Sequence, residues 1–197
     1  MGTHPTIDSV DALIALLGQA SGAFDTPASN SDEADPMSAR EAVDLLAHAL
    51  QCAHETALVH PDDLELQVAA LVHDIGHQLA PGDDAGHGRI GADAVRGLLG
   101  DRVARLIEHH VPAKRYLVTV DPAYRAALSP VSIRTLERQG GTMTEAEVLS
   151  AAELPDWDAG LELRRADEAA KEPDRDVPGL ESWRTVLETV ARTAAGS

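Results

Sequence analysis

The stretch AALVHDIGH, residues 69–77, decides the fold of this chain. An apolar helix ends there in an adjacent imidazole and carboxylate, His73 and Asp74, and Gly76 and His77 follow directly. Burying such polar groups costs free energy unless they find partners. An imidazole and a carboxylate on consecutive residues can contact one metal ion, and the aspartate can reach a second ion through its other oxygen. The stretch therefore predicts a metal site at the end of a buried helix.

Three more histidines and one late aspartate extend this candidate ligand set. His48 lies among Leu and Ala residues of an expected helix, His87 lies in the glycine-rich DDAGHGRIGADA, and His110 ends an amphipathic segment. Asp167 lies in LELRRADEAAK. Each alone is more often a structural residue than a ligand, but together they supply four imidazoles and two carboxylates, enough for a dinuclear site of iron or manganese. The remaining histidines are expected to be exposed or to take part in packing: His4, His54, His60 and His109.

The composition favours an all-α protein. Of 197 residues, 44% are hydrophobic, but only two Trp, two Tyr and one Phe are aromatic, so Ala, Leu and Val must fill the core. Such a core suits closely packed helices better than a sheet rich in β-branched and aromatic residues. The length fits one domain, and we expect residues 1–197 to form a single domain.

Charge and cysteine content narrow the class of protein further. The chain has 16 Lys and Arg against 33 Asp and Glu, a net charge of −17 that would repel nucleic acid. The single cysteine, Cys52, excludes an internal disulfide framework, fits a reducing compartment and is expected to pack in the core. The sequence lacks a signal peptide and an apolar run of about 18 residues. We therefore expect a cytoplasmic protein with neither nucleic acid nor membrane as a partner. A monomer or weak homodimer is the expected state, although nothing in the sequence selects between them.

Apolar spacing predicts helices along most of the chain. One is expected over residues 38–59, opened by the capping-box pair Ser38 and Glu41. The next is expected over 63–79, is apolar almost all round, and runs straight into HDIGH. Shorter segments of helical spacing complete the chain, at residues 10–19, 87–99, 101–110, 122–128, 132–139, 144–150, 151–171 and 180–194.

Two further segments are a loop, whose role as a mobile lid or a plain connection is left open, and a C-terminal helix in which no chemistry is visible. Residues 20–37 mix Gly, Pro, Ser, Asn and acids without apolar periodicity, which predicts a flexible loop. Residues 180–197 hold a C-terminal packing helix with an apolar side formed by Trp183, Leu187 and Val190.

At this point the chain resembles the HD-domain superfamily, named for the adjacent His-Asp pair. Beyond the histidines, it is similar to the phosphonate-cleaving HD oxygenases over nearly all of residues 39–173. The similar stretches are HALQCA at His48, HVPAKRYL at His110, VDPAYRAALSPVSIRTLERQGGTM from Val120, and LRRADEAAK around Asp167. HDIGH is shared with many hydrolases, whereas AKRYL and LSPVSIRTL are much more particular. The group that the chain resembles acts on 2-amino-1-hydroxyethylphosphonate, with sister enzymes for its trimethylammonium analogue and for hydroxymethylphosphonate.

The resemblance implies a fold, a cofactor and a set of site residues. The fold is one HD domain, an all-helical bundle with two iron ions at its centre, a mixed-valence Fe(II)/Fe(III) pair that uses dioxygen as co-substrate. Asp74 would bridge the ions, and Asp74, His77 and Lys114 would be the catalytic residues. The implied iron ligands are His48, His73, Asp74, His87, His110 and Asp167. The implied substrate-binding residues are Glu41, His77, Lys114, Ser132 and Arg164.

The chemistry independently calls for cations near the metals, because a dianionic phosphonate in a pocket of low dielectric needs positive partners. Lys114 lies four residues after His110, about one helical turn if the helix continues through Pro112. Arg164 lies three residues before Asp167, so a helix would place cation and ligand on neighbouring faces. Solvated surface charge is the alternative for both cations.

Glu41 lies seven residues before His48, two helical turns on the same face, and the resemblance implies that it receives a substrate ammonium. Its alternative role is the capping box with Ser38. Some amino-phosphonate enzymes have an iron-binding tyrosine just before this glutamate, whereas this chain has the sequence Pro36-Met37-Ser38-Ala39. The substrate's C2 substituent, whether amino, trimethylammonium or none, is therefore left open.

The sequence is compatible with three functions. The leading hypothesis is a diiron dioxygenase that cleaves the carbon–phosphorus bond of a small 1-hydroxyphosphonate, giving a carboxylate and inorganic phosphate. The alternative is a metal-dependent HD phosphohydrolase acting on a small nucleotide or phosphomonoester, which could use the same ligands. A catalytically silent HD module is the third, although it has no evident reason to keep six ligands.

Overall fold

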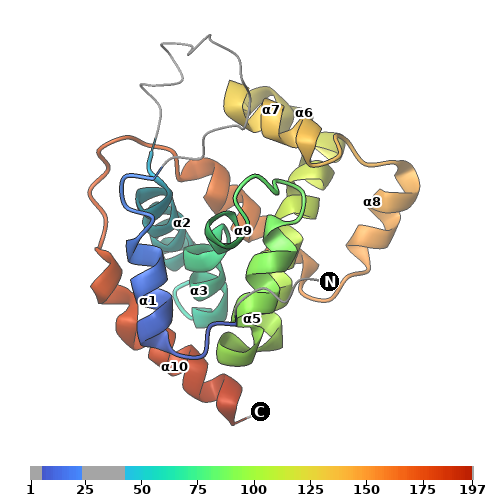
Figure 1. Ribbon diagram of the computed structural model, residues 1–197. Coiled ribbons are helices and arrows are strands. Elements are labelled where there is room, and N and C mark those ends of the chain that lie inside the picture. The colour runs from blue at the N-terminus through green and yellow to red at the C-terminus, as the bar shows by residue number, and fades with distance from the viewer. Residues whose placement is uncertain (1–5, 24–42, 197) are drawn as a thin grey trace.

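The computed structural model describes residues 6–23 and 43–196 of the chain. Within these residues every regular element is helical, which confirms the predicted all-α class (Figure 1). The elements are α1 Val10–Gly18, α2 Leu45–Val59, α3 Leu64–Val72, α4 Ile75–Leu79, α5 His87–Val120, α6 Pro122–Ala127, α7 Pro130–Arg138, α8 Glu145–Ala152, α9 Trp157–Ala169, the short 3-10 helix η1 Leu180–Trp183, and α10 Arg184–Ala195.

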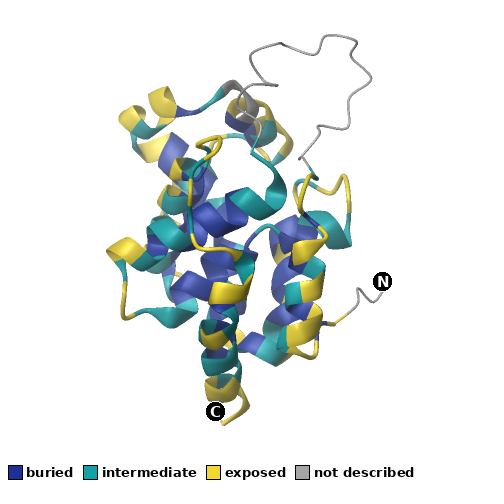
Figure 2. Ribbon diagram, turned by 90° about the vertical axis from the view of Figure 1, so that its left-hand side faces the viewer, coloured by how far each residue is buried: buried dark blue, intermediate teal, exposed yellow. Residues whose placement is uncertain are grey.

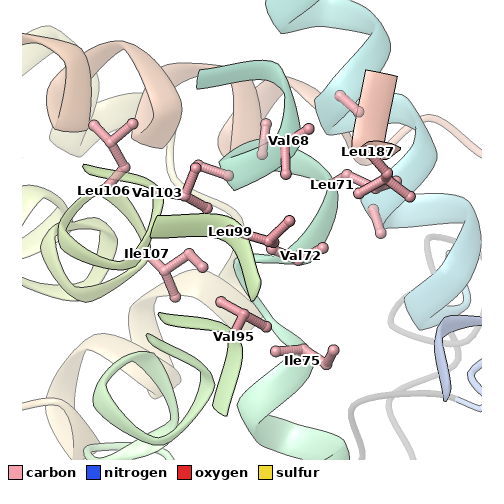
Figure 3. Close-up of a cluster of buried hydrophobic side chains, with 14 of the residues drawn as sticks. Val68, Leu71, Val72, Ile75, Val95, Leu99, Val103, Leu106, Ile107 and Leu187 are labelled. Atoms are coloured by element: carbon pink, nitrogen blue, oxygen red, sulfur yellow. The ribbon is translucent and has the colours of Figure 1, made fainter. Parts of the chain in front are cut away.

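The long helix α5 organises the bundle, because α3, α4, α9 and α10 all pack against it. The helices turn buried faces toward one another and exposed faces outward (Figure 2). Leucine, valine and isoleucine side chains from α3, α4, α5 and α10 meet between them (Figure 3). The labelled members are Val68, Leu71, Val72, Ile75, Val95, Leu99, Val103, Leu106, Ile107 and Leu187. This aliphatic core fixes the helices that carry the histidines.

The chain breaks at the HD pair itself, so the single helix expected over 63–79 is wrong. α3 ends at Val72, and Asp74, with φ −97° and ψ 7°, separates it from the short α4. A close tertiary contact follows directly after the break: a Cβ on Gly76 would lie 1.9 Å from the backbone oxygen of His87. Gly76 thus lets the start of α5 approach α4 closely, which brings His87 toward Asp74.

α5 consists of two helical segments joined at Gly100, whose φ of +88° is readily adopted only by glycine. The second segment does not end at His110 as expected. It continues through Pro112 to Val120, although proline removes one backbone hydrogen bond. This continuation places Lys114 one helical turn beyond His110.

The expected helix over 38–59 is corrected at its start. α2 begins at Leu45, and Asp44 is its N-cap, with Oδ1 accepting a hydrogen bond from the Ala47 amide at 2.7 Å. Asp44 has extended backbone angles, so the helix does not extend through this residue. Ser38, Glu41 and most of the predicted 20–37 loop lie outside the described residues.

Later boundaries shift by a few residues for local reasons. α9 begins at Trp157 rather than 151, after a turn in which Asp156 adopts a φ of +59°.

At the C-terminal end, α10 contacts α1, α3 and α5, and its Leu187 and Val190 are buried, as expected of a packing helix. Among the described helices, none combines the length and the apolar character that a bilayer span requires.

Candidate metal centre

Three helices, α2, α5 and α9, and the break after α3 bring the six sequence-predicted metal ligands together. All but Asp74 are buried residues, and the Asp74 side chain keeps an exposed fraction of 22%. We call this set the histidine–aspartate cluster: His48 from α2, His73 and Asp74 at the break, His87 and His110 from α5, and Asp167 from α9.

One side of the cluster surrounds Asp74 Oδ2. This oxygen lies 3.4 Å from His73 Nε2 and 3.7 Å from His48 Nε2. Asp167 Oδ1 lies 3.3 Å from His48 Nε2 and 3.9 Å from His73 Nε2. Two imidazoles and two carboxylates therefore converge on a space suited to one cation.

The other side surrounds Asp74 Oδ1. His87 Nε2 lies 3.4 Å from it, His110 Nε2 3.6 Å and His77 Nε2 4.0 Å. The His77 ring stacks on the His87 ring, with 3.9 Å between centroids. Asp74 thus lies between two groups of donor atoms, as a bridging carboxylate would.

Backbone carbonyls orient all four cluster histidines in the same way. Each ring places Nδ1 against a carbonyl oxygen, which can only accept, so the proton lies on Nδ1 and the Nε2 lone pair points inward. The contacts are His48 with Ala170 at 2.7 Å, His73 with Ala70 at 2.8 Å, His87 with Asp84 at 2.7 Å, and His110 with Ile107 at 2.5 Å. This is the support that metal-binding histidines ordinarily receive.

Two observations show that the cluster fits metal ions. His73 Nε2 is buried and, among the described residues, has no hydrogen-bond partner. His87 Nε2 and His110 Nε2 lie 2.7 Å apart, although each ring already uses its Nδ1 proton elsewhere. Two lone pairs at that distance repel each other unless a cation lies beside them. The donor set of imidazole nitrogens and carboxylate oxygens suits iron, manganese and similar ions.

Electrostatics keep the two carboxylates ionised. Desolvation opposes the charge of Asp74, but attraction to His73 and His87, whenever these imidazoles are protonated, holds the Asp74 pKa well below the ordinary value. Desolvation likewise opposes Asp167, whose pKa is held well below the ordinary value by Arg164 and His48. Burial raises the pKa of Cys52 nearby, so its thiol stays protonated. The cluster therefore presents two negative charges to a cation.

A second group of polar residues lies against Asp167. Lys114, Ser132 and Arg164 are all buried, each with an exposed fraction of 4%. Burial lowers the pKa of Lys114 to about 7, and its Nζ donates to Thr135 Oγ1 at 2.5 Å. Arg164 donates to Asp167 Oδ2, and its Nε donates to Tyr124 Oη at 2.6 Å. The structure therefore rejects the surface alternative for Lys114 and Arg164.

Sequence reasoning missed two members of this group, Glu168 and Lys171. Lys171 Nζ donates to Ser132 Oγ and to Glu168 Oε2, each at 2.7 Å. The signal was present in LRRADEAAK, because positions 164, 167, 168 and 171 share one face of a helix. We call Lys114, Ser132, Arg164, Glu168 and Lys171 the lysine–arginine cluster.

The other histidines lie away from the cluster where they are described. His109 Nε2 lies 2.9 Å from the Pro155 carbonyl, and the ring meets Trp157 edge-on, a packing role. His54 and His60 are partly buried near the end of α2, and His4 lies outside the described residues.

Comparison with known proteins agrees with this geometry. The family model for the HD domain matches residues 42–152. Hydroxymethylphosphonate dioxygenase of Gimesia maris is 39% identical over 158 residues, which cover 76% of this chain and 78% of the relative. The glycine-betaine-forming [1-hydroxy-2-(trimethylamino)ethyl]phosphonate dioxygenase of Leisingera caerulea is 33% identical over 146 residues, which cover 70% and 74%. These matches confirm the resemblance: the chain belongs to the HD-domain phosphonate dioxygenase family.

Proposed function

We propose that this protein is a dioxygenase that cleaves the carbon–phosphorus bond of a small 1-hydroxyphosphonate, with a carboxylate and inorganic phosphate as products. One observation carries the proposal: Asp167 joins the four inward-facing Nε2 atoms and Asp74 to the buried cations, because it pairs with Arg164 and attracts Lys114 electrostatically. A metal centre beside buried cations suits an anionic substrate that coordinates metal. The names of the two relatives favour this activity over the phosphohydrolase alternative.

Six residues would hold two metal ions, which we propose to be iron in a mixed-valence Fe(II)/Fe(III) state. When bound, such a pair would supply the electron-transfer chemistry and the position at which dioxygen reacts. The ligands would be His48, His73, Asp74, His87, His110 and Asp167, with Asp74 shared between the ions. The carbonyl contacts of the four histidines support this assignment, because they hold the rings before any ion arrives.

The protein's own side chains would bind and orient the phosphonate. Lys114 and Arg164 would neutralise its charge, and Ser132 would hydrogen-bond one of its oxygens. His77 lies beside Asp74 and stacks on His87, at the edge of the cluster where substrate would approach. In this interpretation Asp74, His77 and Lys114 are the catalytic residues. The low dielectric around buried Lys114 strengthens its attraction for a dianion.

Hydroxymethylphosphonate is the first substrate to test. The Gimesia maris relative carries that name and shares the higher identity of the two. The correction at Asp44 also removes the helical argument that aimed Glu41 at an ammonium group near His48. Glu41→Gln should then barely change turnover of hydroxymethylphosphonate. A selective rise in KM for the aminoethyl or trimethylammonioethyl compound would restore Glu41 as an ammonium-binding residue.

We further propose that residues 1–197 form one HD domain that acts in the cytoplasm as a monomer or weak homodimer. Asp167 supports the single domain, because it completes the cluster from α9, beyond the residues that the HD model matches. The charge of −17 supports the absence of nucleic-acid partners.

The deciding experiment is aerobic incubation of iron-loaded protein with hydroxymethylphosphonate and its 2-amino and 2-trimethylammonium analogues. Phosphate release is measured with and without oxygen. The proposal expects release only in the presence of oxygen. Equal release under strict anaerobiosis would show that the cleavage does not use dioxygen. No release from any phosphonate, with phosphate released from an added phosphomonoester, would favour the phosphohydrolase instead.

A further inference from the structure

The carboxylate of Glu168 occupies the centre of the lysine–arginine cluster. Both of its oxygens lie 3.2 Å from Ser132 Oγ, Lys171 Nζ donates to Oε2 at 2.7 Å, and Arg164 Nη2 donates to the same oxygen. Two cations and one hydroxyl thus converge on a single carboxylate. Such a donor set is also what a tetrahedral oxyanion requires.

The charges around Glu168 explain why a carboxylate is present. Arg164 and Lys171 repel the positive charge of Lys114, and Asp167 and Glu168 offset that repulsion. Asp167 already directs Oδ1 toward the histidines, so Glu168 is the acid that neutralises the outer part of the cluster. Without an anion there, Lys171 would lie near the buried Arg164 guanidinium with only Asp167 to offset the two positive charges, which is costly.

Glu168 differs from Asp167 in its freedom to leave. The Glu168 side chain keeps an exposed fraction of 15%, against 7% for Asp167. Its three partners are all side chains, and Lys171 lies beyond the last residue of α9. Rotation of the Glu168 side chain would release Ser132, Arg164 and Lys171 together.

We propose that Lys171 is a further residue of the substrate's anion site, and that Glu168 occupies this site as an internal substitute until the phosphonate displaces it. The identification of the ligand as a phosphonate rests on the proposed function. The wider chemical class is a small tetrahedral oxyanion, because Ser132, Arg164 and Lys171 would bind phosphate by the same contacts. Substrate binding then includes an exchange of one anion for another.

The test is the affinity of metal-loaded protein for inorganic phosphate and methylphosphonate, measured by isothermal titration calorimetry. Glu168→Gln keeps the side-chain shape but loses the competing charge, so both ligands should bind at least about threefold more tightly. Lys171→Met removes a charge-assisted contact and should weaken binding roughly tenfold or more. Glu162→Gln is the matched control, because this glutamate lies on the same helix in an exposed pair with Arg165; it should leave both affinities unchanged.

Thermal unfolding and metal content establish that each variant is folded and loaded, and Glu168→Ala provides a second removal of the charge. Weaker binding in both Glu168 variants would overturn the inference, because Glu168 would then only hold the cations in place. Unchanged affinity in Lys171→Met would also overturn it. Phosphate release from hydroxymethylphosphonate is scored separately: if it is absent while the expected affinity pattern holds, the proposed function fails and the oxyanion site stands.

Discussion

The histidine–aspartate cluster and the lysine–arginine cluster are neighbours built in different ways. Every histidine of the first is held by a backbone carbonyl. The second is held mainly by contacts between side chains, such as Lys171 with Ser132 and Arg164 with Tyr124. Backbone partners move only with their helices, whereas side-chain partners can rotate away. The first cluster is therefore preorganised for ions, and the second can exchange its partners for a ligand.

Replacement of the shared carboxylate should have the largest effect. Asp74→Ala would remove one donor from both groups and leave buried imidazoles without their central charge. We expect elemental analysis to show loss of both ions, and activity to fall below detection. Asp93→Ala on α5 is the control, because its side chain is 52% exposed. Two retained ions in Asp74→Ala would contradict the bridging role.

Metal removal should come next in magnitude. Ions that bind only the folded protein stabilise it by about 2.7 kcal/mol when their concentration is 100 times Kd. Chelation should lower the melting temperature by several degrees, on the order of the shift such a free energy produces in a protein of this size. Ferrous iron should restore it. Thermal unfolding monitored by circular dichroism measures the melting temperature. The same chelator should leave the melting temperature of Asp74→Ala unchanged. An equal shift in that variant would place the stabilising ion elsewhere.

Lys114→Ala tests whether the lysine–arginine cluster binds the substrate. Loss of a charge-assisted contact costs roughly 1.5–3 kcal/mol, so KM should rise on the order of 10- to 100-fold while metal content stays at the wild-type level. Steady-state kinetics measures the rise in KM, and elemental analysis of the same preparation measures the metal content. Loss of the ions would show that Lys114 supports the metal centre instead.

The pKa of Lys114 adds a pH dependence. Burial lowers it to about 7, so in the ligand-free protein the positive charge is present below that pH and lost above it. The kcat/KM should therefore fall as pH rises above about 7. Lys114→Arg retains its charge in this range and should lose that fall. Parallel pH profiles of the two proteins would contradict the assignment.

Replacement of Gln51 should have the smallest effect. It tests whether the histidine–aspartate cluster depends on its backbone contacts. Its amide donates to the Glu172 carbonyl at 2.8 Å and accepts from the Glu172 amide at 3.1 Å. These contacts fix the chain just after Ala170, whose carbonyl orients His48. Gln51→Leu should lower the free energy of unfolding by about 1–3 kcal/mol and reduce iron occupancy without changing phosphate affinity. Denaturant unfolding measures the free energy, and elemental analysis measures the iron occupancy. A change in phosphate affinity with both of these unchanged would contradict the prediction.

Sequence alone identified the six histidine–aspartate cluster residues, because buried imidazoles and carboxylates are costly and rarely occur together without a common purpose. It also gave Lys114 and Arg164, through the resemblance and their spacing from His110 and Asp167. Glu168 and Lys171 were missed because charged residues at helical spacing usually form a solvated face.

Helix boundaries were harder to predict, for two physical reasons. Ser38 and Asp44 both offer cap chemistry before the same apolar run, and the local pattern does not rank them. The break at Asp74 comes just before the close approach of Gly76 to the His87 backbone, and helical periodicity contains no information on such a tertiary contact. Pro112 also led to the expectation that the helix ends at His110, whereas α5 continues through this proline to Val120.

The two sides of Asp74 draw on very different lengths of chain. His77, His87 and His110 follow Asp74 within one continuous segment, whereas His48 and Asp167 are separated by most of the chain. Contacts between distant residues form later in folding, because closing a longer loop costs more entropy. During synthesis, a chain that has emerged as far as α5 would hold the donors for one ion, and the place for the second would close only when α9 docks against α2.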